Sequence, residues 1–472
     1  MSIRLSGLFF FLSAVIVSAV IGRAQPTMND DRWDAPHAAN PILPGYYADP
    51  SVISYEGKYF IYATLDPWGG ETLACWESTD FKNWTYRELN WPTKKACVSG
   101  TSKSAMIWAP SVVRAHDGRF YMYVSVGSEV WVGAAEHPLG PWKNPLGDRP
   151  LIPFGFFPEY HMIDAEAFID DDGTAYLYWG SGLRWKNGRC FAVKLNSDMA
   201  SWSGEAKDVT PENYFEGPFM IKKGGRYFLT YSQGKTVSDT YQIHYSVGDS
   251  PFGPFKEAAN SPILTTDHSR NIVSPGHHAI FSIGEKAYIA YHRHRVPYVA
   301  ETAFRQLCVD VVEFTPEGTI AKIVPTHRGP SLVQSRDTPG NLATSTGGAK
   351  FSASSVGSGD VPHSANHAFD ANFATRWVAD NEHEAWLLVD LSATRKVKRH
   401  DLQFEYAWKQ QNFSIEVSDD GVAWRQVFET GVDGVRGSPV VVETNAEARF
   451  WRIVFPPRAK GSEASLFEWA MY

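Results

Sequence analysis

A hairpin-like segment occurs five times in the first two thirds of the chain, and this repeat limits the fold more than any other feature. Each copy begins with small or apolar residues, turns at a glycine and continues through aromatic and β-branched residues, the pattern of two short antiparallel strands. The copies begin at Asp49, Ala109, Asp164, Glu216 and His277, at intervals of 52 to 61 residues. A repeat of this length, with more strand after each hairpin, is typical of a β-propeller. The sequence therefore predicts five blades.

The first residues of the copies are the place where a catalytic centre is expected. In a propeller the innermost strands surround one axis, so equivalent positions of the five copies meet at one end of the central channel. At these positions the sequence supplies three carboxylates and an imidazole, from Asp49, Asp164, Glu216 and His277. Turn capping explains one acidic residue at a strand start, but it does not explain four ionisable residues in phase with the repeat.

The chain beyond the repeats is expected to form a second domain. Residues 334–349 lose all apolar periodicity and are predicted to be a linker. From Lys350 to Tyr472 further strand-like runs, at residues 386–391, 412–418 and 449–455, predict an all-β sandwich. The propeller is thus expected over residues 36–333, and truncation near Gly348 is expected to leave it folded.

Residues 1–24 have the pattern of a secretory signal peptide. A basic start at Arg4 precedes a short apolar run from Leu8 to Ile21, and small residues precede Gln25. The run is short for a membrane span, although a membrane anchor is the alternative. The mature protein is expected to be secreted or periplasmic, with no membrane attachment after cleavage.

Composition narrows the class of partner. The net charge of −8 argues against nucleic acid. Aromatic residues make up 14% of the chain, with 17 Trp, which suits stacking on sugars and equally suits β-rich cores. The four cysteines are too few and scattered for a disulfide scaffold or a zinc site. Cys75 and Cys97 are expected either to pair after export or to remain buried thiols.

Several motifs together resemble glycoside hydrolase family 43. They are Asn40-Pro-Ile-Leu-Pro-Gly-Tyr-Tyr-Ala-Asp49-Pro-Ser-Val, Trp108-Ala-Pro-Ser-Val, Ile163-Asp164, Glu216-Gly-Pro and Pro275-Gly-His277. The resemblance covers about Pro41 to Pro330, and the family's five-bladed propeller agrees with the repeat count. It implies that Asp49 is the general base, Glu216 the general acid and Asp164 the residue that tunes and orients the acid. Inverting glycoside hydrolysis needs such a base and acid.

The resemblance also implies residues around these three. A calcium ion or a water cluster is expected in the channel near His277, with His278 as the competing ligand and a substrate contact. Trp108 is expected either as an apolar wall for a sugar or as core packing. Arg305 lies where the family often places a substrate-contacting arginine, and the two arginines of residues 293–295 compete with it. No cofactor is expected for the catalysis itself, beyond a structural calcium.

The second domain is similar to discoidin-type modules, a group that includes family 32 carbohydrate-binding modules. The likeness rests on Ala368-Phe-Asp370-Ala-Asn372-Phe-Ala-Thr375-Arg-Trp377 and on the closing Leu466-Phe-Glu468. Within these motifs, oxygen-bearing side chains are expected either to bind calcium or to cap turns; they belong to Asp370, Asn372, Thr375 and Glu468.

These observations predict an inverting, exo-acting glycoside hydrolase that removes terminal pentosyl residues, first of all α-L-arabinofuranosyl, from plant or algal polysaccharides. The alternatives are β-D-xylosidase and galactofuranosidase or galactanase activity of the same family. A rival from another class is a non-catalytic glycan-binding protein, which would not need a base and an acid on facing blades. In every case the expected partner is a carbohydrate.

Overall fold

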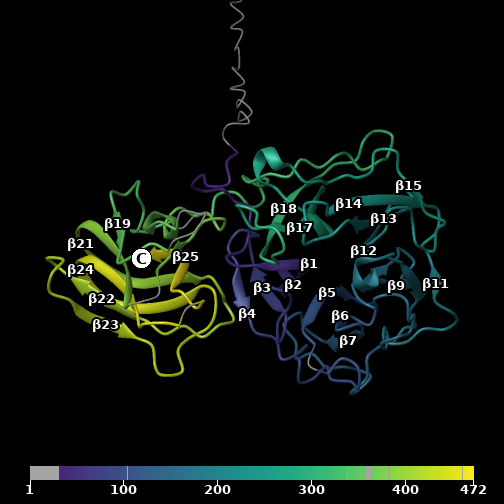
Figure 1. Cartoon of the computed structure of the whole chain (residues 1–472), viewed down its shortest axis with the longest axis horizontal. Coiled ribbons are helices and arrows are strands. Elements are labelled where there is room, and N and C mark those ends of the chain that lie inside the picture. The colour runs from purple at the N-terminus through teal and green to yellow at the C-terminus, as the bar shows by residue number, and fades with distance from the viewer. Residues whose placement is uncertain (1–30, 104, 337–338, 358–362, 381–382, 460) are drawn as a thin grey trace, which may run out of the picture.

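The structure is a computed structural model, which describes residues 31–336 except 104, together with 339–357, 363–380, 383–459 and 461–472. Two all-β domains lie beside each other (Figure 1), a five-bladed propeller and an antiparallel sheet domain. The predicted fold class and number of blades are confirmed. The signal peptide predicted at residues 1–24 lies outside the described residues. No helix within the described ranges is long and apolar enough to cross a membrane.

Each blade is an antiparallel sheet whose first strand lies innermost. Blade one comprises β1 (Tyr47–Tyr55), β2 (Lys58–Leu65), β3 (Ala74–Ser78) and β4 (Thr85–Arg87). Blade two comprises β5 (Ile107–Arg114), β6 (Phe120–Val126) and β7 (Val130–Ala135). Blade three comprises β8 (Glu166–Ile169), β9 (Ala175–Trp179), β10 (Phe191–Lys194) and β11 (Lys207–Asp208). Blade four comprises β12 (Glu216–Lys223), β13 (Arg226–Gln233), β14 (Gln242–Gly248) and β15 (Lys256–Glu257), and blade five β16 (Gly276–Ile283), β17 (Lys286–His294) and β18 (Arg305–Val312).

The five inner strands form a closed ring. Each packs beside the next in chain order, and β16 packs beside β1. Large aromatic side chains fill the space between neighbouring blades; between blades five and one these include Tyr47, Trp76 and Tyr288. Between blades one and two the core includes Cys75 and Cys97, and both are free buried thiols. The high aromatic content therefore serves the core in large part.

Every blade places one residue in the left-handed backbone region near the start of its inner strand. These residues and their φ angles are Asp49 (53°), Ala109 (44°), Asp164 (58°), Gly217 (60°) and His277 (37°). In all blades but the third the ladder register shifts at this point, as in a β-bulge. Such a conformation costs a non-glycine residue about 1–2 kcal/mol, and bulges next to active sites re-aim side chains. The strain thus falls on the positions that carry Asp49, Asp164 and His277.

The fourth copy of the repeat is displaced by one residue from the predicted alignment. Gly217, and not Glu216, occupies the left-handed position, while Glu216 pairs with Ser232 on the ladder. The prediction that Glu216 is equivalent to Asp49 is therefore wrong by one residue. A side chain here would be strained, because φ is positive and a Cβ at Gly217 would make a tight 3.2 Å contact with the His277 ring. The true equivalents of Glu216 are Ala48, Trp108, Ile163 and Gly276.

The C-terminal domain is a seven-stranded antiparallel sheet in the order β20-β25-β21-β24-β22-β23, with β19 also paired to β21. Its strands are β19 (Lys350–Ala353), β20 (Trp377–Val378), β21 (Ala385–Phe404), β22 (Ser414–Ser418), β23 (Arg425–Glu429), β24 (Val440–Phe455) and β25 (Ser465–Met471). Two halves of β21 alternate between buried and less buried residues, with five exposed residues at 392–396 between them. Both halves of this long strand thus contribute buried residues to the core of the domain. Short 3-10 helices are η2 (Leu183–Trp185), η3 (His268–Arg270) and η4 (Ala365–Ala368).

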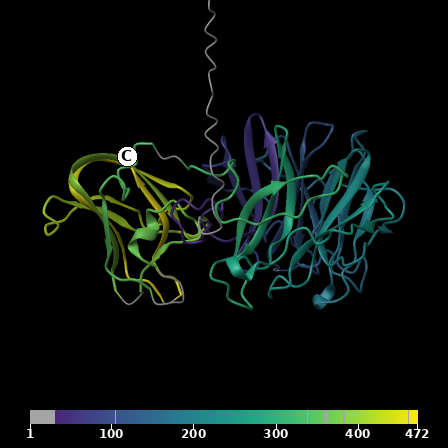
Figure 2. The same ribbon diagram turned by 90° about the horizontal axis from the view of Figure 1, so that it is seen from above.

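The segment predicted to be a linker packs against both domains, which lie in contact when viewed from above (Figure 2). Arg336 donates hydrogen bonds to the carbonyls of Ala39 and Pro41 on the propeller side, at 2.6 and 2.8 Å, and to Ala371 on the other side, at 3.2 Å. Ala343 is fully buried in the core of the C-terminal domain. Residues 334–349 therefore do not form a free tether.

Candidate active site

A pocket of about 290 Å³ lies at the end of the channel where the left-handed residues converge. The residues that line it include Asp49, Asp164, Glu216, Trp108, His277 and Arg305, all of which the sequence had singled out. A larger cavity, of about 1320 Å³, is lined by later residues of the inner strands and by none of the three acids just named. The chemistry is therefore assigned to the smaller pocket.

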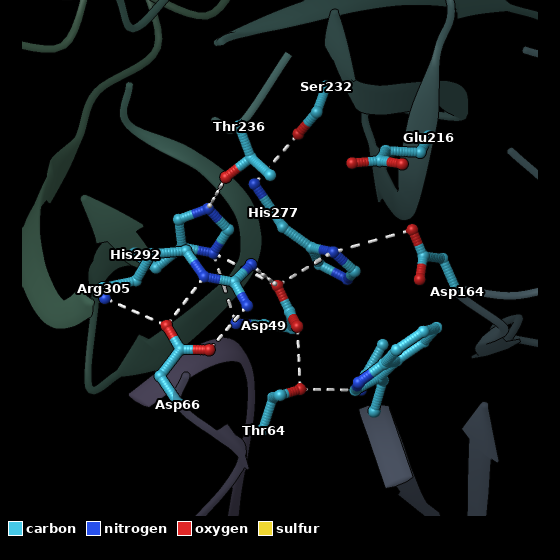
Figure 3. Close-up of polar contacts among 12 residues, drawn as sticks. Asp49, Thr64, Asp66, Asp164, Glu216, Ser232, Thr236, His277, His292 and Arg305 are labelled. Carbon is cyan, nitrogen blue, oxygen red and sulfur yellow. Dashed lines mark hydrogen bonds and ion pairs between the residues drawn. The ribbon is translucent and has the colours of Figure 1, made fainter. Parts of the chain in front are cut away.

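Asp49 is a buried carboxylate that accepts hydrogen bonds from two side chains and lies beside the ring of His292, whose Nδ1 accepts a hydrogen bond from the Asp49 backbone N–H at 3.3 Å (Figure 3). Thr64 Oγ1 donates to its Oδ2 at 2.7 Å, and Arg305 Nη1 donates to its Oδ1 at 3.2 Å. The ring Nδ1 of His292 lies 3.2 Å from the same Oδ1. Burial raises the pKa of Asp49, but the charge of Arg305, followed by His277 and His292, outweighs it and holds the pKa well below its usual range. Asp49 is therefore ionised at neutral pH.

Arg305 is fixed by a second acid that the sequence analysis missed. Its Nε and Nη2 donate to the two carboxylate oxygens of Asp66, both at 2.8 Å, and its backbone N–H donates to Asp66 at 2.9 Å. A bidentate pair of this kind fixes the plane of the guanidinium, which leaves Nη1 aimed at Asp49. Arg305 thus lines the pocket chiefly as the partner of Asp49. Asp66 follows β2 outside the repeated position, so the repeat gave no signal for it.

Asp164, which is buried, and Glu216, which is partly buried, lie on the far side of His277 from Arg305 (Figure 3). Burial raises the pKa of Glu216, while hydrogen bonds from Tyr241 and Ser181, both at 2.7 Å, partly offset this. Burial, followed by the charges of Glu216 and Asp49, raises the pKa of Asp164 well above its usual range. Because the interaction between two charges is reciprocal, ionisation of either carboxyl favours the protonated form of the other.

His277 stands between the base and this pair. Its Nδ1 lies 3.3 Å from Asp49 Oδ1 and 3.7 Å from Asp164 Oδ2. Burial lowers the pKa of His277, so the ring is neutral near pH 7. Within the described part of the chain, no three His, Cys, Asp or Glu side chains form a group suited to hold a metal. His277 thus contacts both carboxylates, and the calcium ion expected near it stays a prediction from the sequence.

His278 does not line the pocket, so its expected contact with substrate is not supported. It is only 3% exposed, its Nε2 lies 2.7 Å from Thr230 Oγ1, and its ring packs against Phe219. Burial lowers its pKa to about 3. Neighbouring residues of a strand point to opposite faces, and since His277 faces the pocket, His278 faces the core.

Aromatic rings form the mouth of the pocket. Trp108 Nε1 donates to the carbonyl of Trp68 at 2.8 Å, which fixes both residues at one side. Trp185 stacks on Phe215, with ring centroids 6.0 Å apart and an interplanar angle of 4°. Trp68 and Trp185 remain 42% and 39% exposed. Such exposed rings offer flat apolar faces to a sugar. Trp68 and Trp185 lie in connecting segments outside the repeat, so the sequence analysis missed them.

Three of the four residues proposed for calcium in the C-terminal domain lie together. Asp370 accepts a hydrogen bond from Thr375 Oγ1 at 2.7 Å, and the Asn372 backbone N–H donates to both Asp370 and Glu468, at 3.0 and 3.1 Å. The Asn372 side chain instead donates to the carbonyls of Trp33 and Ala35. Burial raises the pKa of Asp370 to about 7, and burial followed by the charge of Asp370 raises that of Glu468 well above its usual range.

Asp164→Asn should shift the basic limb of the pH–rate profile to lower pH, because Glu216 loses the neighbouring charge that helps to keep it protonated. The same change should raise Tm by about 2–4 °C, because it removes a buried ionisable group whose charged form is disfavoured. A pH profile of kcat/KM and a thermal melt at pH 8 check both. An unchanged basic limb would show that Asp164 does not tune Glu216.

Comparisons with known proteins agree with this site. The chain matches the family described as "Glycosyl hydrolases family 43" over residues 38–320, and "NedA-like, galactose-binding domain" over residues 367–453. A β-D-galactofuranosidase from Aspergillus niger is 33% identical over 316 residues, which are 62% of this chain and 86% of that protein. An arabinoxylan arabinofuranohydrolase from Paenibacillus polymyxa is 26% identical over 366 residues, and the match covers 67% of this chain but only 56% of that protein.

A solved structure described as "Glycoside hydrolase" is similar over both domains. It has a TM-score of 0.76 at 26% identity and covers 93% of this chain and 99% of that chain. The family match spans the whole propeller from before Asp49 to beyond Arg305. The chain therefore belongs to glycoside hydrolase family 43.

Proposed function

We propose that this chain is an inverting, exo-acting furanosidase that removes terminal α-L-arabinofuranosyl residues from polysaccharides or oligosaccharides. The observation that supports the inverting hydrolysis is the contrast between the carboxyls within one pocket. The pKa of Asp49 is held low by Arg305, whereas the pKa values of Asp164 and Glu216 are both raised, chiefly by burial. Inversion needs this combination, one carboxylate to accept a proton from water and one carboxylic acid to donate a proton to the leaving oxygen.

The proposed reaction is a single displacement at the anomeric carbon. Asp49 accepts a proton from a water molecule as that water forms a bond to C1 on one face of the sugar. The bond between C1 and the leaving oxygen breaks on the other face, and Glu216 transfers its proton to that oxygen. Asp49 and Glu216 belong to β1 and β12, which are not neighbours in the ring of inner strands. This arrangement suits a base and an acid on opposite sides of one sugar.

A furanosyl substrate is proposed because the similar proteins named above act on furanosides by their descriptions. α-L-Arabinofuranose and β-D-galactofuranose have the same ring configuration and differ in the carbon chain at C4. The relative at 33% identity makes galactofuranosyl the second candidate. A small pocket with an aromatic mouth suits one terminal sugar rather than the middle of a polymer. The polysaccharides proposed as substrates are extracellular, which agrees with the export expected from the signal peptide predicted at residues 1–24.

Initial rates on three 4-nitrophenyl glycosides test the proposal: α-L-arabinofuranoside, β-D-galactofuranoside and β-D-xylopyranoside. We expect the arabinofuranoside to have the highest kcat/KM, and a higher value for the galactofuranoside would favour the second candidate. Faster turnover of the xylopyranoside would contradict a furanosidase. Binding of glycans without turnover of any of the three would favour a non-catalytic binding protein. The variant Asp49→Asn serves as the blank for contaminating activity.

We also propose a structural calcium ion in the C-terminal domain, held by Asp370 and Glu468 with the Thr375 hydroxyl nearby. The residues offer oxygen atoms, the ligands that a hard cation prefers: the partly buried carboxyls of Asp370 and Glu468 lie close enough to share one backbone N–H donor, and the Thr375 hydroxyl contacts Asp370. Metal binding requires both acids to be ionised, so calcium should raise Tm more at pH 8 than at pH 5.5. Asp370→Asn should abolish the gain, whereas the exposed-site control Asp419→Asn should retain it. An equal Tm with calcium and with chelator at pH 8 would contradict the site.

A further inference from the structure

The C-terminal domain inserts a loop into the propeller beside the first catalytic strand. This insertion loop, Glu405–Trp408, follows β21. Ala407 is fully buried and belongs to the same core cluster as Tyr47 and Trp76 of blade one. Trp408 packs edge-on against Tyr47, with ring centroids 5.8 Å apart. Tyr47 lies two residues before Asp49, so the loop touches the strand that carries the base.

A second set of contacts forms around Tyr46, which is 1% exposed. Its ring lies 6.1 Å from Tyr406 and 6.5 Å from Phe467 of the C-terminal domain, and 5.0 Å from Phe304 of the propeller. A Cβ on the preceding Gly45 would lie 3.0 Å from the Glu405 carbonyl oxygen. The chain here is therefore in close backbone contact with the loop. Phe304 is the residue before Arg305, so this cluster joins the segments that lead to Asp49 and to Arg305.

Polar groups fix the same interface. Glu405 and Arg376 form an ion pair at 3.1 Å, with 11% and 13% of their side chains exposed, and Ser465 donates to Glu405 at 2.6 Å. The Arg376 guanidinium lies 5.8 Å from the centre of the Tyr46 ring. On the other side of Arg305, Gln306 Nε2 donates to the Phe373 carbonyl at 3.0 Å. Both chain neighbours of Arg305 thus take part in this interface.

We propose that the C-terminal domain is a positioning part of the catalytic centre. The insertion loop and residues 373–376 hold the starts of β1 and β18 in register, so that Arg305 stays on Asp49 and keeps that carboxylate ionised and aimed. Small displacements of a catalytic group reduce rates strongly, by up to about 100-fold for 1 Å. This proposal differs from the expectation that truncation near Gly348 leaves an intact propeller. Removal of the C-terminal domain would expose Tyr46 and Tyr47, and with them the segments that carry Asp49 and Arg305.

The test compares Trp408→Ala with Trp408→Phe in the full-length chain. We expect Trp408→Ala to lower kcat about tenfold, to leave KM within about twofold, and to shift the acid limb of the pH profile upward, because Asp49 loses part of its contact with Arg305. Trp408→Phe, which restores an aromatic contact with Tyr47, should recover most of kcat. Hydrogen exchange measured by mass spectrometry should increase for Trp408→Ala in peptides that contain Tyr47–Asp49 and Phe304–Gln306.

A matched control is Arg436→Gln, which removes an exposed ion pair across the same domain interface, 3.8 Å from Glu88, away from β1 and β18. It should change neither kinetics nor exchange at those peptides. Folded Trp408→Ala with the kcat and acid limb of the wild type would overturn the proposal. The proposal would also be overturned if the activity of Trp408→Ala fell only in proportion to its unfolded fraction, with the acid limb of the pH profile unchanged. The proposal rests on the proposed hydrolase function. The exchange measurement does not depend on which sugar the enzyme prefers, so it distinguishes a failure of this proposal from a failure of the proposed function.

Discussion

Asp49→Asn should reduce hydrolysis of every glycoside substrate by about 10⁴-fold, the upper end of what general-base catalysis contributes. An amide cannot accept a proton from water at neutral pH, and no other pocket carboxylate is held ionised as Asp49 is by Arg305. The loss should be independent of the leaving group, because the base acts on the water. Initial rates on 4-nitrophenyl and 2,4-dinitrophenyl glycosides measure it. Residual activity within tenfold of the wild type would show that another group activates the water.

Glu216→Gln should affect substrates according to their leaving groups. We expect a loss of about 10²–10⁴-fold on natural glycosides, whose leaving oxygen needs a proton, and a much smaller loss on 2,4-dinitrophenyl glycosides, whose leaving group departs as an anion. The basic limb of the pH profile should disappear on the activated substrate, since it reports loss of the Glu216 proton. Hydrogen bonds from Tyr241 and Ser181 reach the two carboxylate oxygens, so the isosteric amide should keep the local structure.

The control for this variant is Ser181→Ala, which removes one hydrogen bond to Glu216 but keeps the acid. Its losses should be similar for good and poor leaving groups. An equal loss on both classes of substrate in Glu216→Gln would contradict the role of Glu216 as the acid.

The catalytic carboxyls should affect folding stability in opposite directions. The pKa of Asp49 is depressed in the folded state, so its contribution to stability is present above its unfolded pKa and is lost as pH falls. The pKa values of Asp164 and Glu216 are raised, so their contribution is present at low pH and is lost as pH rises through the folded values. Asp49→Asn is therefore expected to lower Tm at pH 7, whereas Asp164→Asn is expected to raise it.

The sequence predicted the blades and the convergence of three acids on one pocket because both follow one repeat. Each blade must present an inner strand to the axis, and that requirement left Asp49 and Asp164 at equivalent positions. The error of one residue at Glu216 arose because aligning by charge ignores backbone conformation. Gly217, the residue without a Cβ, marks the position where the chain adopts a positive φ. Glycine was thus a better guide to the register than the acid beside it.

The residues that tune the acids could not be read from the repeat. Thr64, Asp66 and Tyr241 contact the pocket residues Asp49, Arg305 and Glu216 from a second strand and from connecting segments, where spacing carries no signal. The docking of the C-terminal domain was missed for a related reason. Ala407 and Trp408 look like an ordinary loop in sequence, and only the assembled structure shows that the propeller core surrounds them.

The anomeric configuration of the first product is the measurement that tests the roles of Asp49 and Glu216 most directly. Proton NMR of the first minutes of hydrolysis of a 4-nitrophenyl α-L-arabinofuranoside, or of the galactofuranoside if that is the better substrate, identifies the anomer before mutarotation. A base that activates water and an acid on the opposite side predict a product of inverted configuration, β-L-arabinofuranose from the first substrate. A product that retains the configuration of the substrate would contradict the assignment of Asp49 as the base.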